Sequence, residues 1–119
     1  MIRIKPFPFI CDLDDDEAKL ATTLLDYVDR YRCYFERNEP KSAERKVMLD
    51  PLPRVVLMRG VGLFGIGRSA KEAGIAADLA VQTARVVPLA EAYGRFQPIS
   101  ERDLFEMEYW SLEQAKLRK

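Results

Sequence analysis

The residues most suggestive of chemistry lie in the stretch RVVLMRGVGLFGIGRSAKE, residues 54–72. Gly60, Gly62 and Gly65 form a Gly-x-Gly-x-x-Gly pattern, which after an apolar run is typical of a dinucleotide-binding turn. Such a turn also needs a helix that begins inside it and an acidic residue about twenty residues further on, at a strand tip. Here the predicted helix begins after the pattern, and Asp78 lies within that helix. The pattern therefore favours a strand whose glycines let another backbone approach.

Arg68 and Ser69, at the predicted start of the helix, form a candidate anion site, with Arg54, Arg59 or Lys71 nearby. Free backbone N–H groups in a first helical turn and guanidinium groups are the donors that bind phosphate well. The alternative is that Ser69 only caps the helix, with Glu72 at the capping-box spacing, while the basic side chains are solvated. We favour the capping interpretation because serine is a common helix cap.

No histidine occurs among the 119 residues, which removes several kinds of site from this chain. Ser-His-Asp and Cys-His catalysis require an imidazole base, and many zinc sites use histidine ligands. Cys11 and Cys33 lack the spacing of a metal-binding pair, and we expect two reduced, partly buried thiols. Any chemistry would therefore have to use carboxylates, lysine, tyrosine, cysteine or a cofactor. We expect no catalytic residue, no metal site and no cofactor within this chain.

The composition indicates one ordinary domain or a piece of a larger protein. The chain has 119 residues, of which 48% are hydrophobic and 32% are charged. Nineteen basic residues balance nineteen acidic ones, so we expect neither nucleic acid nor a membrane surface as a partner. The N-terminal stretch MIRIKPFPFI has no apolar run of signal-peptide length, and we expect a cytoplasmic protein.

The first third of the chain predicts one strand and one long helix. Residues 2–10 alternate weakly and contain two prolines, which is typical of an edge strand. A helix is expected over residues 14–37, where Asp14 and Glu17 have capping-box spacing. Apolar side chains then recur three and four residues apart, as on the buried stripe of a helix. This stripe consists of Ala21, Leu24, Leu25, Val28, Tyr31 and Phe35.

A polar loop and a hairpin are expected next. Residues 38–53 predict a long loop with one helical turn near residues 43–46, and a loop of this length is often mobile or in contact with a partner. Two short apolar strands follow, at residues 55–58 and 61–66. The Arg-Gly pair between them is short enough for a tight turn.

A second helix is expected over residues 70–87, capped by Ser69 and ended by Pro88. Its inner face is almost entirely alanine, so the helix axis should lie close to the sheet that it covers. This face consists of Ala73, Ala76, Ala77, Ala80, Ala84 and Val87.

The C-terminal residues predict two short helices, with caps at Ser100 and Ser111. Apolar side chains are dense here, and they either pack onto this domain or form a contact surface for a neighbouring domain or subunit. The interface candidates are Leu104, Phe105, Tyr109 and Trp110.

Together these elements predict an α/β fold. A small sheet with a β-hairpin at about residues 55–66 should be covered by the helices at about residues 14–37 and 70–87, with a short helical tail at the C-terminus. We expect residues 1–97 to form the α/β segment and residues 98–119 a helical connector.

Two stretches resemble known proteins. The sequence VVLMRGVGLFGIGRSAKEA resembles the strand-turn-strand-helix segment of class II aldolases, the family of fuculose- and rhamnulose-phosphate aldolases and the adducin head. The run LDPLPRVVLMRGVGLFGIGRSAKEAGIAAD, with GRFQPISERDLFEMEYWSLEQAKL, is similar to the central region of a bifunctional rhamnulose-1-phosphate aldolase/short-chain dehydrogenase family. In that family this region lies between the aldolase part and the dehydrogenase domain. The resemblance is good over residues 48–117 and looser over residues 2–37, and EYWSLEQAKL is its most specific part.

The chain departs from the aldolase pattern at the metal site. In class II aldolases a histidine before the glycine of this strand binds zinc, and the matching position here is Val61. The upstream pair of zinc histidines is absent as well. Tyr109 and Lys116 have the wrong spacing for the Tyr-x-x-x-Lys pair of the dehydrogenase. The resemblance thus implies zinc and NAD(P) for the aldolase and dehydrogenase parts of a parent protein, and neither for this chain.

Three functions follow as hypotheses. The leading one is a non-catalytic domain that connects the aldolase and dehydrogenase domains of one polypeptide and packs in a homo-oligomer. The second is a contribution to a shared active site in the full-length protein, through Arg59, a phosphate at Arg68-Ser69 or the acidic residues of the tail, with metal ligands supplied from elsewhere. The third is a free-standing nucleotide-binding module.

Overall fold

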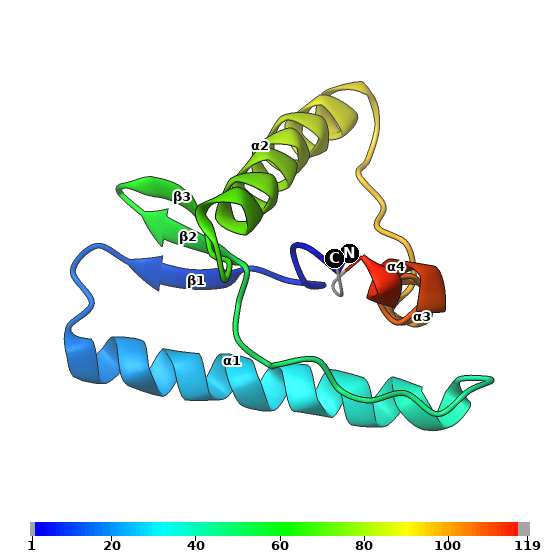
Figure 1. The fold of residues 1–119 in the computed structure, drawn as a ribbon. Helices are drawn as coiled ribbons and strands as arrows, with labels where there is room; N and C mark the ends of the chain where they lie inside the picture. The colour runs from blue at the N-terminus through cyan, green and yellow to red at the C-terminus, as the bar shows by residue number, and fades with distance from the viewer. Residues whose placement is uncertain (1, 117–119) are drawn as a thin grey trace.

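The computed structural model describes residues 2–116, which form a small three-stranded sheet between two long helices (Figure 1). The expected α/β architecture is confirmed at this level. In chain order the elements are β1 (Phe9–Asp12), α1 (Glu17–Asn38), the 3-10 turn η1 (Glu39–Lys41), β2 (Val55–Arg59), β3 (Gly62–Gly65), α2 (Ala70–Tyr93), α3 (Glu101–Glu108) and α4 (Ser111–Ala115).

The sheet has the strand order β1-β2-β3. β1 runs parallel to β2 with Phe9 opposite Val56, and β2 and β3 form an antiparallel hairpin. The predicted hairpin is confirmed, and Gly60 in its turn has a φ of +84°, which glycine adopts without strain. The expected edge strand is much shorter than predicted, because residues 2–8 precede β1 as turns and bends.

α1 begins later than predicted. Asp16, rather than Asp14, is the N-cap, and its carboxylate accepts a hydrogen bond from the Lys19 backbone N–H at 2.8 Å. The predicted apolar stripe is partly wrong, since Leu25 is 66% exposed. The buried face of α1 consists instead of tyrosine rings whose hydroxyls are hydrogen-bonded. The buried residues are Tyr27, Tyr31 and Tyr34, together with Asn38 at the end of the helix.

The loop after α1 carries its helical turn at an unexpected place. The 3-10 turn forms at η1, directly after α1 and with Pro40 inside it, instead of at residues 43–46. The later part of the loop is attached to the core, because the Leu49 N–H donates to the Tyr109 hydroxyl at 3.2 Å.

α2 covers the opposite face of the sheet from α1 and is longer than predicted. Ala76 and Ala80 are buried against Val55, as the alanine-rich face predicts. The contact is so close that a Cβ added at Gly65 would lie 2.1 Å from the Ala73 carbonyl oxygen. The helix does not end at Pro88 but continues to Tyr93.

The continuation past Pro88 has a physical reason. A proline within a helix leaves the carbonyl group four residues before it without a hydrogen-bond donor. That residue is Ala84, which is exposed, so water can satisfy its carbonyl group. Figure 1 shows that the C-terminal half of α2 extends beyond the sheet.

The C-terminal tail, defined here as residues 101–116, packs onto α1. Ser100 caps α3 as predicted, accepting a hydrogen bond from the Asp103 N–H at 3.1 Å, whereas the N-cap of α4 is Trp110 and not Ser111. Phe105 and Tyr109 are each only 1% exposed and belong to a core cluster with two α1 tyrosines. They are therefore core residues of this domain, which corrects their selection as interface candidates.

Within residues 2–116, no helix combines the length and the apolar character that crossing a membrane requires.

Candidate functional site

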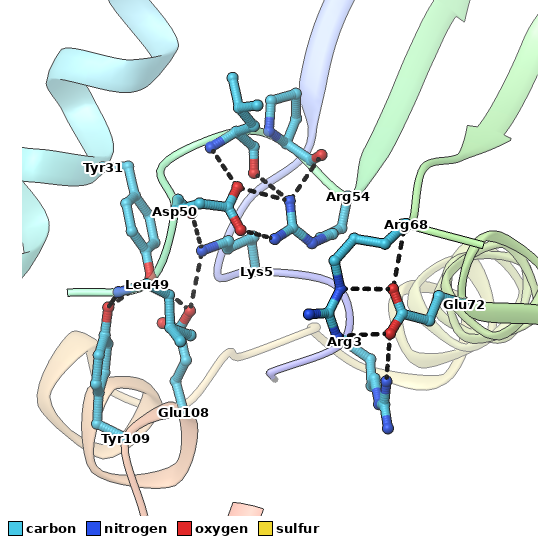
Figure 2. A network of polar contacts seen from close by, with 12 residues as sticks. Arg3, Lys5, Tyr31, Leu49, Asp50, Arg54, Arg68, Glu72, Glu108 and Tyr109 are labelled. Atoms are coloured by element: carbon cyan, nitrogen blue, oxygen red, sulfur yellow. Dashed lines mark hydrogen bonds and ion pairs between the residues drawn. The ribbon is translucent and has the colours of Figure 1, made fainter. Parts of the chain in front are cut away.

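Three arginines from separate segments meet at the start of α2. Arg3, Arg54 and Arg68 line a cleft of about 150 Å³ together with Asp50 and Glu72. Figure 2 shows the three guanidinium groups on one side of the polar network, near the first turn of α2. We call this place the arginine cleft.

Ser69 acts there as the helix cap that the sequence predicts. Its hydroxyl accepts a hydrogen bond from the Glu72 N–H at 3.2 Å, and the Glu72 carboxylate accepts one from the Arg68 N–H at 3.0 Å. The local arrangement is therefore close to a capping box. Anion binding by Arg68 and Ser69 stays a prediction.

The charges of the arginine cleft largely compensate one another. Arg68 hydrogen-bonds Glu72 through two nitrogens, at 2.8 and 3.2 Å, and Arg3 lies 3.8 Å from the same carboxylate. These hydrogen bonds, with Arg68 as the main donor, lower the pKa of Glu72 to about 2. Arg54 pairs with Asp50. Three guanidinium groups against two carboxylates leave the lining with one excess positive charge.

Arg59 does not belong to this group, which corrects the predicted set. It lies at the opposite end of β2 from Arg54 and pairs with Asp12, the last residue of β1, at 3.2 Å. The strand between Arg54 and Arg59 separates the two guanidinium groups, so a single anion cannot contact both Arg59 and Arg68.

Val61 lies in the hairpin turn and is 52% exposed. Its side chain has no lone pair, so the position that matches a zinc histidine offers no ligand. Among residues 2–116 no three histidine, cysteine, aspartate or glutamate side chains are grouped closely enough to hold a metal ion. Cys11 is buried, Cys33 is exposed, and both are free thiols.

A buried polar cluster lies deeper in the fold and was not predicted. The Lys5 and Glu108 side chains are both 0% exposed, and the Lys5 Nζ lies 3.9 Å from a Glu108 carboxylate oxygen. The Lys5 Nζ also donates a 2.7 Å hydrogen bond to the Asp50 carbonyl oxygen and sits 3.9 Å from the centre of the Tyr31 ring. Figure 2 shows Lys5 between Asp50 and Glu108.

Tyrosines complete the hydrogen bonding of this cluster. Glu108 accepts hydrogen bonds from the Tyr31 hydroxyl at 2.8 Å and the Tyr34 hydroxyl at 3.1 Å. The Tyr31 and Tyr109 hydroxyls lie 2.7 Å apart. Every buried side-chain nitrogen and oxygen in the described part of the chain has a partner, as a stable buried network requires.

Burial shifts the titration of both charged groups. It lowers the pKa of Lys5 to about 8, and the Glu108 carboxylate only partly opposes this effect. Burial also raises the pKa of Glu108, against the attraction of Lys5. Both shifts reflect the cost of keeping a charge away from water.

The sequence contains one signal for this cluster. Tyr27, Tyr31 and Tyr34 recur at helical spacing, and rings with hydroxyls on one helix face predict buried polar partners. The partners themselves carry no signal. Lys5 stands between Ile4 and Pro6 in the predicted edge strand, and Glu108 is one of several acidic residues in the tail.

Comparison with known proteins assigns the family. The chain matches the family described as aldolase class II, second domain, over residues 1–117. It belongs to this family. The class II aldolase resemblance that the residues from Val55 onward indicate is thereby confirmed at the level of the family.

A segment of a much longer protein is similar to this chain. The chain is 28% identical over 124 aligned residues to the "Uncharacterized oxidoreductase YuxG" of Bacillus subtilis (strain 168). The alignment covers 98% of this chain and 18% of that protein, so the chain spans less than a fifth of its relative. No solved structure matches the chain.

Proposed function

We propose that this second domain is a non-catalytic connecting domain of a bifunctional sugar-metabolism enzyme, in which a class II aldolase is joined to a short-chain dehydrogenase. Rhamnulose 1-phosphate is the substrate that the sequence resemblance suggests for the aldolase part. Zinc would act in the aldolase part and NAD(P) in the dehydrogenase part, both outside this chain, in a cytoplasmic protein.

The observation that carries the proposal is the direction in which the buried titratable groups face. Lys5 and Glu108 are turned toward each other and toward tyrosines in the core, and neither side chain is accessible to a substrate. Val61 offers no metal ligand at the position where an aldolase needs one. The alignment covers only 18% of the length of a protein named an uncharacterized oxidoreductase, which also supports a role within a larger enzyme.

The test is an aldolase assay on the purified chain. We expect no cleavage of a ketose 1-phosphate with added zinc, measured by coupled detection of the aldehyde and triose products. Zinc-dependent cleavage above the rate of a zinc-only blank would refute the connecting role. Calorimetry with NAD and NADP addresses the nucleotide-binding module, and submicromolar binding would revive that hypothesis.

The arginine cleft supports a second candidate function, a phosphate site that contributes to a shared active site. Arg3, Arg54 and Arg68 supply guanidinium groups beside the first turn of α2, with one excess positive charge. We expect inorganic phosphate to shift the amide resonances of Gly67 and Ser69, and Arg68→Gln to abolish the shift. Arg85→Gln, an exposed change elsewhere on α2, is the matched control. Unchanged kinetics of both activities after Arg68→Gln in the full-length protein would count against the site.

Contacts with neighbouring domains and with a second copy are part of the proposal. Trp110 is 54% exposed and Leu104 is half-buried, and they are the interface candidates that remain. The outer half of α2 exposes further large apolar side chains, namely Val81, Val86, Leu89 and Tyr93. Exposed apolar groups favour association, and light scattering should show a dimer or larger species. A strictly monomeric chain at high concentration would contradict the homo-oligomer.

A further inference from the structure

The two ends of the described chain meet, although more than 100 residues separate them. We call residues 2–8 the N-terminal segment. Its Arg3 donates a hydrogen bond to the Lys116 carbonyl oxygen at 3.2 Å, and its Lys5 forms the buried ion pair with Glu108. Figure 1 shows the N-terminal segment beside α3 and α4, and Figure 2 shows Lys5 between Asp50 and Glu108, with Arg3 beside Glu72.

The N-terminal segment is held in an unusual conformation to make this contact. Lys5 has a φ of +63°, a left-handed backbone conformation that costs energy for any residue with a Cβ. The surrounding contacts keep it there: the Tyr27 hydroxyl donates to the Phe7 carbonyl oxygen at 3.0 Å, and the Arg30 guanidinium lies 3.9 Å from the centre of the Phe7 ring. The strained backbone is thus compensated by contacts on several sides.

Apart from the N-terminal segment, the tail is attached mainly to α1, through aromatic rings and through Arg37 and Asn38, which donate hydrogen bonds to Glu101. α3 packs on α1, with the Phe105 ring 5.6 Å from that of Tyr34 and 5.7 Å from that of Phe35. Residues 95–100, which join α2 to α3, contain no helix or strand. The N-terminal segment, in contrast, continues directly into β1 and so into the sheet. The Lys5–Glu108 contact therefore links the tail to the sheet side of the domain.

We propose that Lys5 and Glu108 form a latch that joins the N-terminal segment to the C-terminal tail, so that both open and close as one unit. The groups that face this pair are the Asp50 carbonyl oxygen and Arg54 from the loop, and tyrosine hydroxyls from α1 and from residue 109. Neither side chain can reach water without movement of one of the two segments, so removal of either partner releases both.

The functional meaning of the latch rests on the proposed connecting role. In a domain with neighbours on both sides, the latch would hold the two attachment points side by side and fix how the neighbours are oriented. The latch itself is a property of this chain and can be tested on it alone.

Native-state amide hydrogen exchange tests whether the two segments are coupled. We expect Lys5→Met to accelerate exchange in the tail, and Glu108→Gln to accelerate it in the N-terminal segment, each by at least about tenfold. Glu108→Gln keeps one of the two oxygens that accept from the tyrosines and preserves the size of the side chain, so it removes the charge with little loss of packing. Lys71→Met and Glu36→Gln change exposed residues of the same types and should leave both segments unchanged.

The pattern of exchange separates a latch from a merely stabilising pair. Acceleration confined to residues 2–8 and 101–116, with β2 and α2 unaffected, supports the latch. Uniform acceleration along the chain, or acceleration only in the segment that carries the substitution, overturns it. If Glu108→Gln does not fold, Glu108→Asp keeps the charge but shortens the side chain, and the same coupled pattern is expected.

The outcome is independent of the proposed function. Zinc-dependent aldolase activity of the chain would refute the connecting role and leave a coupled exchange pattern valid. Uniform exchange would refute the latch and leave the connecting role untouched.

Discussion

The two long helices of this domain pack in opposite ways. α2 approaches the sheet through alanines and Gly65, so that backbone lies against backbone. α1 packs through tyrosine rings, and the space that these rings create toward α3 holds the Lys5–Glu108 pair. Small residues thus bring an element close, whereas large amphipathic rings leave room for polar groups and supply their hydrogen bonds.

The ion pairs of the two regions differ accordingly. The Arg68 side chain in the arginine cleft is 69% exposed, whereas Lys5 and Glu108 have no exposed side-chain surface. Water and salt screen the first kind of pair, and it contributes little to stability. In the second kind, each charge depends on its protein partners, so removal of one partner is costly.

Glu108→Leu should have the largest effect, because it leaves the Lys5 charge buried without its partner and removes the acceptor of two tyrosine hydroxyls. Breaking a buried pair from one side typically lowers the free energy of unfolding by about 3–5 kcal/mol. Urea unfolding at pH 7 measures this loss. The double variant Lys5→Met with Glu108→Leu should regain much of it, and a double variant whose loss equals the sum of the single losses would show that the pair is not coupled.

Gly65→Ala should have the second largest effect. It should lower the free energy of unfolding by about 3 kcal/mol, near the upper end of the usual cost of overpacking. The added Cβ would lie 2.1 Å from the Ala73 carbonyl oxygen and 2.7 Å from the Ala77 nitrogen, and both atoms belong to the α2 backbone. Gly74→Ala is the matched control, because nothing lies within 4 Å of its added Cβ. Thermal unfolding should show Gly74→Ala slightly stabilised through better helix propensity, and equal behaviour of the two variants would contradict the close packing of α2.

The pH dependence of the free energy of unfolding should show the lowered pKa of Lys5. Its pKa is about 8 in the folded chain and near its ordinary value of 10.5 in the unfolded chain, so the unfolded state binds more protons between these values. Stability from this group therefore rises with pH in that window and is lost as the pH falls through about 8. Between pH 8 and 10 the wild type should gain about 2 kcal/mol over Lys5→Met, measured by urea unfolding. A constant difference between the two proteins would mean that Lys5 titrates normally.

Glu72→Gln should have the smallest effect. Hydrogen bonds from Arg68 hold the pKa of Glu72 at about 2, below its ordinary value of 4.5. Stability from this group is thus present above about pH 4.5 and lost as the pH falls toward 2, so the variant should show a slightly flatter acid limb in thermal unfolding. The difference in stability between the variant and the wild type should shrink further in 1 M salt. A large loss of stability at pH 7 that does not depend on salt would show that the Arg68–Glu72 pair behaves like a buried ion pair.

Local patterns predicted the elements well where nearby residues alone decide the structure. The turn at Gly60 and the serine caps at Ser69 and Ser100 are local features, and each lies where the sequence indicates. Local rules failed at Pro88, because α2 extends beyond the sheet there and water can replace the missing hydrogen bond. The same rules predicted that Leu25 is buried, although it is exposed. Periodicity alone does not distinguish a buried apolar face from a buried face of hydrogen-bonded tyrosines.

The candidate site divides in the same way. Arg68, Ser69 and Glu72 are close in sequence, and their arrangement could be expected from the capping pattern. Arg54 is one of the nearby basic residues that the sequence suggests, and it does line the cleft. Arg3 joins only through the fold, and Arg59 is removed from the cleft by the length of β2. A set of residues from distant segments cannot be predicted from spacing, because the sheet register decides which ends meet.

By itself, the sequence determined the helix caps at Ser69 and Ser100, the hairpin, the alanine face of α2 and the lack of any imidazole, since these follow from residue type and short-range spacing. Only the tertiary structure decided that Lys5 meets Glu108 and that Phe105 and Tyr109 lie inside. The physical reason is that a buried charge is tolerated only where partners converge from several segments, and that convergence exists only once the chain has folded.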